Sequence, residues 1–212
     1  MENLTNLKAL DLSWAGRQHK ELPIGEFIPP AYTIKIEGLK YLKNLEQLKL
    51  AHNRIRKIEG LENLKKLRYL DLSHNLIEKI ENLENLTQLE YLDLSYNIIQ
   101  KIEGIDQLKK LKELYLSEND IIKIEGLDNL INLQSLDLNK NNIKKIEGLQ
   151  SLTNLWLLDL SENAIKKIEG LDNLLNLIEL NLTNNFIIKR ENLSHLHKLK
   201  YVYLDGYYPL YL

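Results

Sequence analysis

The sequence contains no cysteine, and its first residues lack two features of exported proteins. Secreted solenoids and small extracellular domains usually depend on disulfides, so an oxidising compartment is disfavoured. Residues 1–12 have neither the basic start nor the continuous apolar run of a signal peptide. No stretch approaches the roughly 18 consecutive apolar residues that a membrane helix needs. We therefore expect a cytoplasmic protein, or a nuclear one in a eukaryote, that does not associate with membranes.

Neither sign of charge dominates, since 28 Lys+Arg against 30 Asp+Glu give a formal net charge of −2. This balance argues against a dedicated nucleic-acid binder. The signatures of catalysis are also missing, because the sequence has no cysteine nucleophile, no glycine-rich phosphate loop and no metal-ligand spacing among its five histidines. His52 and His74 are equivalent in adjacent repeats, but no third ligand is evident near them. We expect no catalytic residues, no cofactor and no metal.

What the sequence does have is a repeat of 22 residues. Its first leucine recurs at Leu45, Leu67, Leu89, Leu111, Leu133, Leu155, Leu177 and Leu199. Units of this size cannot bury their own apolar face, so they stack on their neighbours as a solenoid. We expect a single domain over residues 1–212: a first coil at 1–44 with an insert at 16–31, seven repeats at 45–198, and a C-terminal cap at 199–212.

Each repeat position has a physical role. Leu48 and Leu50 alternate with outward residues as in a short strand, and stacked strands of this kind make one parallel sheet. One asparagine per repeat, Asn53 in the first regular one, lies where the chain turns away and can satisfy buried backbone groups. One glycine per repeat, such as Gly60, predicts a left-handed turn, and only Asn82 and Asn192 replace it.

The pattern LxxLxLxxNxIxxIEGLxxL resembles the 22-residue class of the leucine-rich repeat family. The resemblance implies an α/β fold, namely a right-handed solenoid with a parallel concave sheet and mostly 3-10 or extended turns on the convex side. Its members bind other proteins on the concave sheet. The stretch KYVYLDG at 200–206 resembles the C-terminal cap of intracellular members, above all regulatory subunits of type-one protein phosphatase. Residues covering the last core layer would then be Tyr207, Tyr208, Leu210, Tyr211 and Leu212.

Three further features favour structural interpretations. Lysine and glutamate ladders, which begin at Lys57 and Glu59, are expected to form a solvated ion-pair face. The insert at 16–31 is expected to cap the N-terminal end, although a binding loop is the alternative. Arg190 stands where other repeats have isoleucine, and we expect its side chain to point outward.

The residues that vary on the concave face are the candidates for function. Aromatic side chains flanked by carboxylates suit a protein-binding surface. Aspartate recurs at one outward strand position and forms an acidic row of Asp71, Asp93, Asp137 and Asp159. A structural explanation of this row alone is favoured, because LDLS is a common strand sequence in this family. Trp156 is equally compatible with packing against a loop edge. The candidate partner-binding residues are Tyr69, Asp71, Tyr91, Asp93, Tyr96, Tyr115, Asp137, Trp156, Leu157 and Asp159.

The main hypothesis is a monomeric, non-catalytic scaffold that binds a partner protein on its concave face and regulates an enzyme such as a phosphatase. The alternative is a structural protein that self-associates through its end coil or the insert at 16–31. Nucleic-acid binding is opposed by Asp71, Asp93, Asp137 and Asp159, which would repel phosphates.

Overall fold

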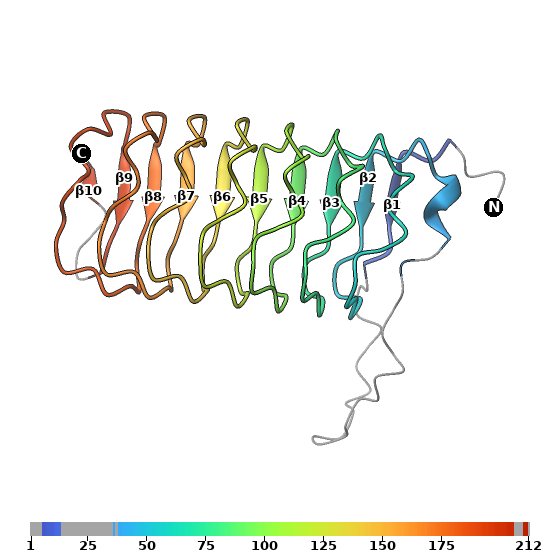
Figure 1. Cartoon of the computed structure of the whole chain (residues 1–212), viewed down its shortest axis with the longest axis horizontal. Helices are drawn as coiled ribbons and strands as arrows, with labels where there is room; N and C mark the ends of the chain where they lie inside the picture. Colours follow the sequence, from blue (N-terminus) through green and yellow to red (C-terminus); the bar gives the residue numbers. More distant parts are fainter. Residues whose placement is uncertain (1–5, 14–35, 37, 206–209, 212) are drawn as a thin grey trace, which may run out of the picture.

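The computed structural model describes residues 6–13, 36, 38–205 and 210–211, which form one ten-stranded sheet in sequence order (Figure 1). Strands β1 to β9 are parallel, and β10 pairs antiparallel with β9. The strands are β1 (Ala9–Asp11), β2 (Gln47–Lys49), β3 (Tyr69–Asp71), β4 (Tyr91–Asp93), β5 (Glu113–Tyr115), β6 (Ser135–Asp137), β7 (Leu157–Asp159), β8 (Glu179–Asn181), β9 (Tyr201–Tyr203) and β10 (Leu210–Tyr211). The expected solenoid with a parallel sheet is confirmed.

The strand register follows the repeat, because each residue of β3 pairs with the one 22 positions later in β4, as Leu70 does with Leu92. Strand β1 pairs with β2 across a longer span, from Leu10 to Leu48. This span of 38 residues is one repeat plus 16, which agrees with an insert in the first coil. The insert at 16–31 lies outside the described residues.

The core is a continuous stack of leucine and isoleucine between the sheet and the returning chain. The side chains that one coil buries almost completely are Leu67, Leu70, Leu72, Ile77, Ile80, Leu83 and Leu86. Each side chain removed from water in this way contributes about 1.5–3 kcal/mol before the entropy cost of folding. Because no coil can enclose its own leucines, the stability of each depends on its neighbours.

The asparagine column links successive coils. Oδ1 of Asn119 accepts a hydrogen bond from the Ile99 backbone N–H of the preceding coil at 2.9 Å. Its Nδ2 donates to the carbonyl oxygens of Leu94, Leu116 and Ser117 at 3.0–3.2 Å. A buried amide thus satisfies four backbone groups that an apolar residue would leave unpaired.

The glycine column has the left-handed backbone that the sequence predicts. Gly126 has φ +70°, and a Cβ added there would lie 2.5 Å from the Ile102 carbonyl oxygen. Asn82 takes the equivalent position with φ +60°, and its Nδ2 donates to the Ile58 carbonyl oxygen at 2.7 Å. Asparagine is therefore tolerated because its amide bonds to the same backbone oxygen that an aliphatic side chain would only crowd.

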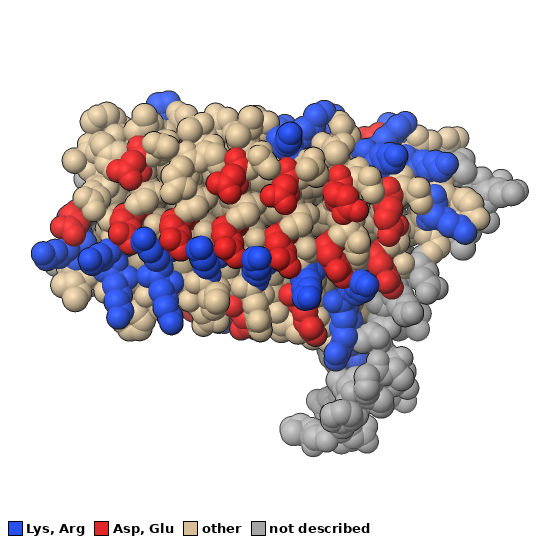
Figure 2. Space-filling view, in the orientation of Figure 1, with Lys and Arg blue, Asp and Glu red and all other residues tan. Residues whose placement is uncertain are grey.

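The side opposite the sheet consists of turns and extended chain, and among the described residues only Leu39–Tyr41 forms a helix, a 3-10 turn (η3). Rows of basic and acidic side chains run along the molecule (Figure 2). Lys101 lies 3.2 Å from Glu103, and Lys123 lies 3.6 Å from Glu125. The residues of both pairs are substantially exposed, as expected for a solvated ion-pair face.

The last coil is more open than the regular coils before it. Arg190 is exposed, as expected, and Ile187 and Leu193 are only partly buried, whereas their counterparts Ile165 and Leu171 are fully enclosed. Of the residues expected to cap this end, Leu210 and Tyr211 form β10 beside β9. Tyr207, Tyr208 and Leu212 lie outside the described residues.

Candidate protein-interaction surface

The sheet face, as we call it, consists of three columns of outward side chains. Two columns come from the first and third residue of each strand, since the middle residue, such as Leu70 or Leu92, is fully buried. The third column follows the strand, at residues with φ between +53° and +59° from His52 to Glu162. Nine of the ten candidate residues lie in these columns, and Trp156 does not.

A tyrosine ladder lies on β3, β4 and β5. The rings of Tyr69 and Tyr91 are stacked, with centroids 4.1 Å apart and planes at 9°. Tyr115 continues the ladder from the third-position column, 5.3 Å from Tyr91 and tilted by 41°. At the other end, Nζ of Lys49 lies 5.8 Å from the centroid of the Tyr69 ring. In-register pairing places Tyr69 directly opposite Tyr91, whereas Tyr115 pairs with Asp93 and lies diagonal to Tyr91.

A second aromatic ladder follows the strands. His52 stacks on His74, and His74 stacks on Tyr96, each with ring centroids 4.0 Å apart. Tyr96 therefore stacks with the histidines, and the sequence did not identify this ladder. Its signal was available, because the three residues occupy the same repeat position in consecutive coils.

Burial and the neighbouring His52 lower the pKa of His74, so its neutral form is favoured. Within the described part of the chain, no group of three or more His, Cys, Asp or Glu residues could hold a metal ion.

The acidic row has a structural role in its turns. Oδ1 of Asp71, Asp93, Asp137 and Asp159 accepts the backbone N–H two residues later at 2.8–3.0 Å. This contact closes each strand-to-turn junction and fixes the plane of each carboxylate. Asn181 forms the same turn in the next coil, where its Oδ1 accepts the Thr183 N–H at 3.2 Å.

The surroundings of this row disfavour the ionised form of two of its carboxyl groups. Burial raises the pKa of Asp93, and it raises the pKa of Asp137 to about 6, with further contributions from the charges of Asp159 and Asp93. Burial likewise raises the pKa of Tyr91, and it raises that of Tyr115 to about 12. Both phenols are therefore neutral donors at physiological pH, and the Tyr115 hydroxyl donates to Glu113 at 2.8 Å.

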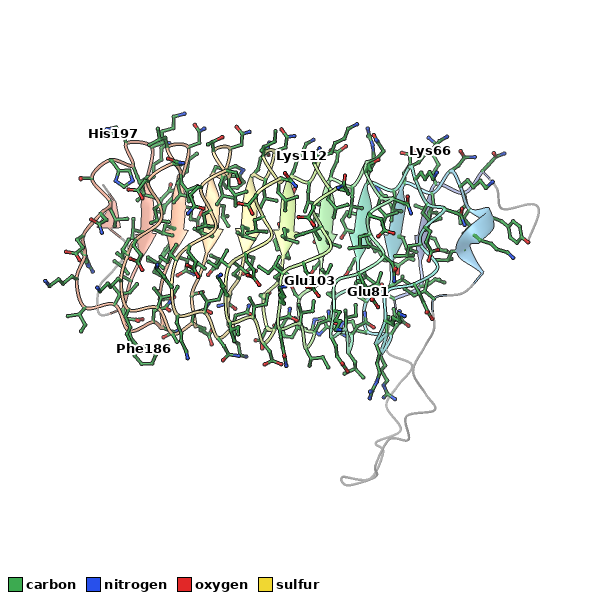
Figure 3. The ribbon with its side chains drawn as sticks, viewed as in Figure 1. Lys66, Glu81, Glu103, Lys112, Phe186 and His197 are labelled. Carbon is green, nitrogen blue, oxygen red and sulfur yellow. The ribbon has the colours of Figure 1, made fainter. Side chains whose placement is uncertain are left out.

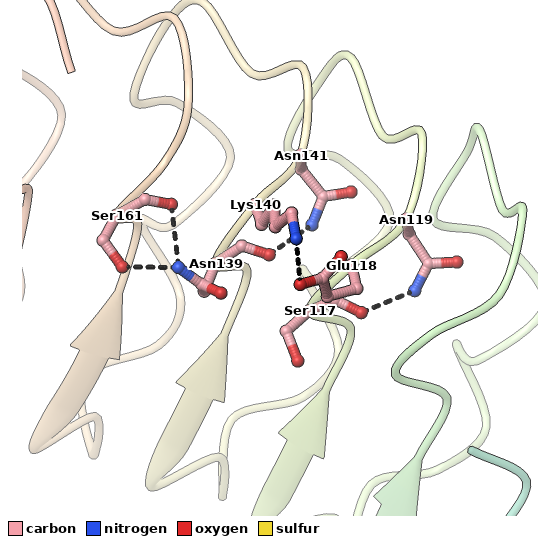
Figure 4. Close-up of polar contacts among 7 residues, drawn as sticks. All are labelled: Ser117, Glu118, Asn119, Asn139, Lys140, Asn141 and Ser161. Atoms are coloured by element: carbon pink, nitrogen blue, oxygen red, sulfur yellow. Dashed lines mark hydrogen bonds and ion pairs between the residues drawn. The ribbon is translucent and has the colours of Figure 1, made fainter. Parts of the chain in front are cut away.

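Beyond β5, β6 and β7, polar side chains connect adjacent coils (Figure 4). Nδ2 of Asn139 donates to the Ser161 hydroxyl at 2.7 Å. Lys140 forms an ion pair with Glu118 of the preceding coil. The third column therefore changes from aromatic to charged residues after Tyr96. Beyond β5, outward aromatic residues recur on the described part of the face only near the C-terminal end, where Tyr201 and Tyr203 are the first and third residues of β9.

Trp156 lies just before β7, in the row at the strand starts that also contains Lys112 (Figure 3). Its side chain is 40% exposed. Ile131 and Leu175 of the neighbouring coils are also exposed near this edge. Leu157 is the first residue of β7 and is half-buried on the sheet face. The structure thus places Trp156 on a border of the sheet, away from the tyrosine ladder.

These features define a solenoid of 22-residue coils with a leucine core, an asparagine ladder and an open face of short parallel strands. The family model for "Leucine Rich repeats (2 copies)" matches residues 43–85, 87–129 and 131–173. These segments make up more than half of the chain, which therefore belongs to the leucine-rich repeat family.

Solved structures agree with this assignment. Internalin C2 of Listeria monocytogenes is 36% identical with a TM-score of 0.74, over 80% of this chain and 75% of the internalin. A leucine-rich repeat protein of Leptospira interrogans is 30% identical with a TM-score of 0.73, over 79% of this chain and 44% of that protein. TLR13, solved in complex with ssRNA13, is 27% identical with a TM-score of 0.66, over 79% of this chain and 30% of TLR13. The chain thus spans less than half of the latter two, and no curated protein matches it in sequence.

Leucine-rich repeat proteins generally serve as protein-interaction scaffolds and are typically non-catalytic. No helix in the described part of the chain is long and apolar enough to cross a membrane. The proteins named above include no phosphatase subunit, so that resemblance stays a prediction.

Proposed function

We propose that the chain is a non-catalytic scaffold that binds a partner protein on its sheet face. The observation that carries this proposal is the pair of aromatic ladders on neighbouring coils, Tyr69–Tyr91–Tyr115 and His52–His74–Tyr96. Aromatic side chains contribute most of the binding energy at many protein interfaces, because they bury a large area and keep a polar tip.

The rigidity of the ladders supports this proposal. Tyr69 and Tyr91 project from strands that pair in register, and stacking at 4.1 Å restricts both rings before any partner arrives. A side chain that is already ordered loses little conformational entropy on binding. The surface is therefore suited to a rigid contact that does not require the solenoid to change shape.

A binding assay with purified variants tests the proposal. Wild-type protein, Tyr69→Ala/Tyr91→Ala and Trp156→Ala would be immobilised and compared for the partners that they retain from a lysate of the source organism. Tyr41→Ala removes another exposed tyrosine, 52% exposed in η3 and outside the sheet face, and serves as the control. We expect the double variant to lose a partner that the control keeps. The proposal is wrong if both test variants, folded by circular dichroism, keep every wild-type partner.

Self-association is a second candidate function, because β1 forms one end of the sheet and pairs only with β2 among the described strands. An edge strand of this kind offers backbone groups to another chain. Light scattering over a concentration series distinguishes the two functions. A constant monomeric mass, which is our expectation, counts against self-association, and a mass that rises with concentration supports it.

Two finer proposals accompany the scaffold. The absence of cysteine favours a reducing compartment such as the cytoplasm. Regulation of a type-one phosphatase is supported by the resemblance of the KYVYLDG stretch alone. Nucleic acid is disfavoured as a ligand because the acidic row would repel phosphates, although the related TLR13 was solved with RNA.

A further inference from the structure

The charged side chains on the sheet face of β3 to β7 are mostly negative. Its carboxylates are Asp71, Asp93, Glu113, Glu118, Asp137, Asp159 and Glu162. The lysine in these columns, Lys140, is ion-paired with Glu118. The whole chain has a formal charge of only −2, so negative charge is concentrated on this face. A concentration of this kind attracts a basic partner and repels an acidic one.

On β3 and β4 this charge lies beside the tyrosine ladder. Tyr69 and Asp71 are the first and third residues of β3, and Tyr91 and Asp93 are the first and third of β4. Residues two apart in a strand project from the same side, roughly 7 Å apart. Each strand therefore presents an aromatic ring and a carboxylate side by side, and in-register pairing places the two combinations next to each other.

A cation already lies at one end of this ladder, because Nζ of Lys49 is 5.8 Å from the centroid of the Tyr69 ring. This cation–π contact covers the face of the Tyr69 ring that is not stacked on Tyr91, so the ladder tolerates positive charge beside it and meets a partner with its ring edges. A guanidinium group suits the site better than an ammonium group. Its fork of N–H donors makes two parallel hydrogen bonds to a carboxylate, whereas an ammonium is a more strongly hydrated point charge.

The carboxylates are also positioned to accept such donors. Oδ1 of Asp71 and of Asp93 is held by the N–H of Ser73 and Ser95, at 3.0 and 2.9 Å. The Ser73 hydroxyl also donates to Asp71 Oδ1 at 2.7 Å, and the Tyr91 hydroxyl donates to Asp93 Oδ2 at 3.5 Å. An ionised carboxylate has about four acceptor sites, so each group keeps capacity for a partner. The fixed plane reduces the entropy lost when a guanidinium group binds.

We infer, on the basis of the proposed function, that the partner segment bound to the sheet face is arginine-bearing, and that its guanidinium groups contact Tyr69, Asp71, Tyr91 and Asp93. The two carboxylates supply charge-assisted hydrogen bonds, and the outer edges of the two stacked rings supply apolar contact. The acidic residues of β5 to β7 extend the attractive field along the face, so the segment follows the row of strands.

Fluorescence anisotropy with the full chain tests this inference. The probe is a labelled 12-residue peptide of alternating arginine and serine, and the comparison is the same peptide with lysine. We expect the arginine peptide to bind at least threefold more tightly, with an affinity that falls as salt is raised. Equal affinity for the two peptides, or no binding of either at low salt, overturns the inference.

Variants locate the contact. Asp71→Asn/Asp93→Asn removes two charges but preserves the turns, because Asn181 already makes the equivalent turn. We expect it to weaken binding of the arginine peptide roughly tenfold, and Tyr69→Ala/Tyr91→Ala to do the same. Glu103→Gln/Glu125→Gln removes the same charge from the ion-pair ladder opposite the sheet and should change affinity less than twofold. Equal losses for both carboxylate pairs would show general attraction and contradict the site.

Failure of the inference is distinguishable from failure of the proposed function. If the peptides do not bind but a cellular partner still requires Tyr69 and Tyr91, the scaffold proposal stands and the arginine assignment is wrong. A single-stranded RNA oligonucleotide that binds in a manner dependent on both tyrosines, while the arginine peptide does not bind, also overturns the assignment.

Discussion

Asp137 should destabilise the folded chain at neutral pH, and replacing it with asparagine should be stabilising. Its carboxyl group is mostly enclosed on β6, near Asp159 and Asp93, and its pKa is raised from an ordinary value of 3.8 to about 6. Burial contributes most to this rise, the two neighbouring charges add to it, and hydrogen bonds from Asn139 and Ser117 oppose it. Above pH 6 the ionised form is therefore less stable in the folded state than in the unfolded chain.

The size of the effect follows from the shift. A raised pKa means that the favourable contribution is fully present below pH 3.8 and is lost as the pH rises through 6. About two pKa units correspond to roughly 3 kcal/mol at most, and relaxation of the surroundings reduces this to about 1–3 kcal/mol. Asp137→Asn removes the charge but keeps an acceptor for the Asn139 N–H, as Asn181 does for Thr183.

Urea denaturation at several pH values measures this prediction. At pH 7.5 we expect Asp137→Asn to raise the unfolding free energy by about 1–3 kcal/mol with an unchanged slope, and to lose this advantage below pH 4. The control, Glu147→Gln, removes a carboxylate that lies 3.8 Å from Lys145 in the ion-pair ladder and should change stability by less than about 0.5 kcal/mol. An Asp137→Asn gain that is absent at pH 7.5, or that persists at pH 3.5, would refute the reasoning.

Two further predictions concern the coil framework and are measured by the same denaturation. Gly126→Ala should cost roughly 1–3 kcal/mol, because its Cβ would lie 2.5 Å from the Ile102 oxygen at φ +70°. Gly126→Asn should cost less, since Asn82 occupies the equivalent position, and an equal loss would contradict this explanation. Asn119→Ala should cost roughly 3 kcal/mol, because it leaves the buried Ile99 N–H and three carbonyl groups without their partner. A loss below 1 kcal/mol would show that the asparagine column is dispensable.

Much of the fold was predictable because the period of the sequence determines the register of the sheet. Once Leu70 and Leu92 are recognised as equivalent, their strands must pair at that offset for both leucines to be buried. Positive φ at Gly60 and Asn82 was likewise predictable, since glycine and asparagine are the residues that tolerate it best. The span from β1 to β2 followed from the irregular distance between the first two coils.

The candidate surface was less predictable. The sequence shows which column a side chain belongs to, but it does not show which neighbouring side chains that residue contacts. The sequence predicts Tyr96 on the concave face together with Tyr69 and Tyr91. Tyr96 stacks instead on His74, since the left-handed turn that follows each strand separates its column from the tyrosines. The raised pKa of Asp137 was also inaccessible, because it depends on how deeply the carboxyl group is enclosed.

The repeat also explains how the outward residues of the candidate interaction surface vary between coils while the core residues stay the same. In a solenoid, a substitution at one outward position changes one point in a column and leaves the buried contacts of its coil intact. Successive coils with Tyr69 and Tyr91 therefore create a stack without any change in the core leucines. The same logic places Asp71 and Asp93 side by side, where their repulsion costs stability. Asp71 and Asp93 close their turns, but Asn181 closes the equivalent turn without a charge, so the turns alone do not require two like charges beside the stacked rings. This cost is the reason to assign them to a cationic partner.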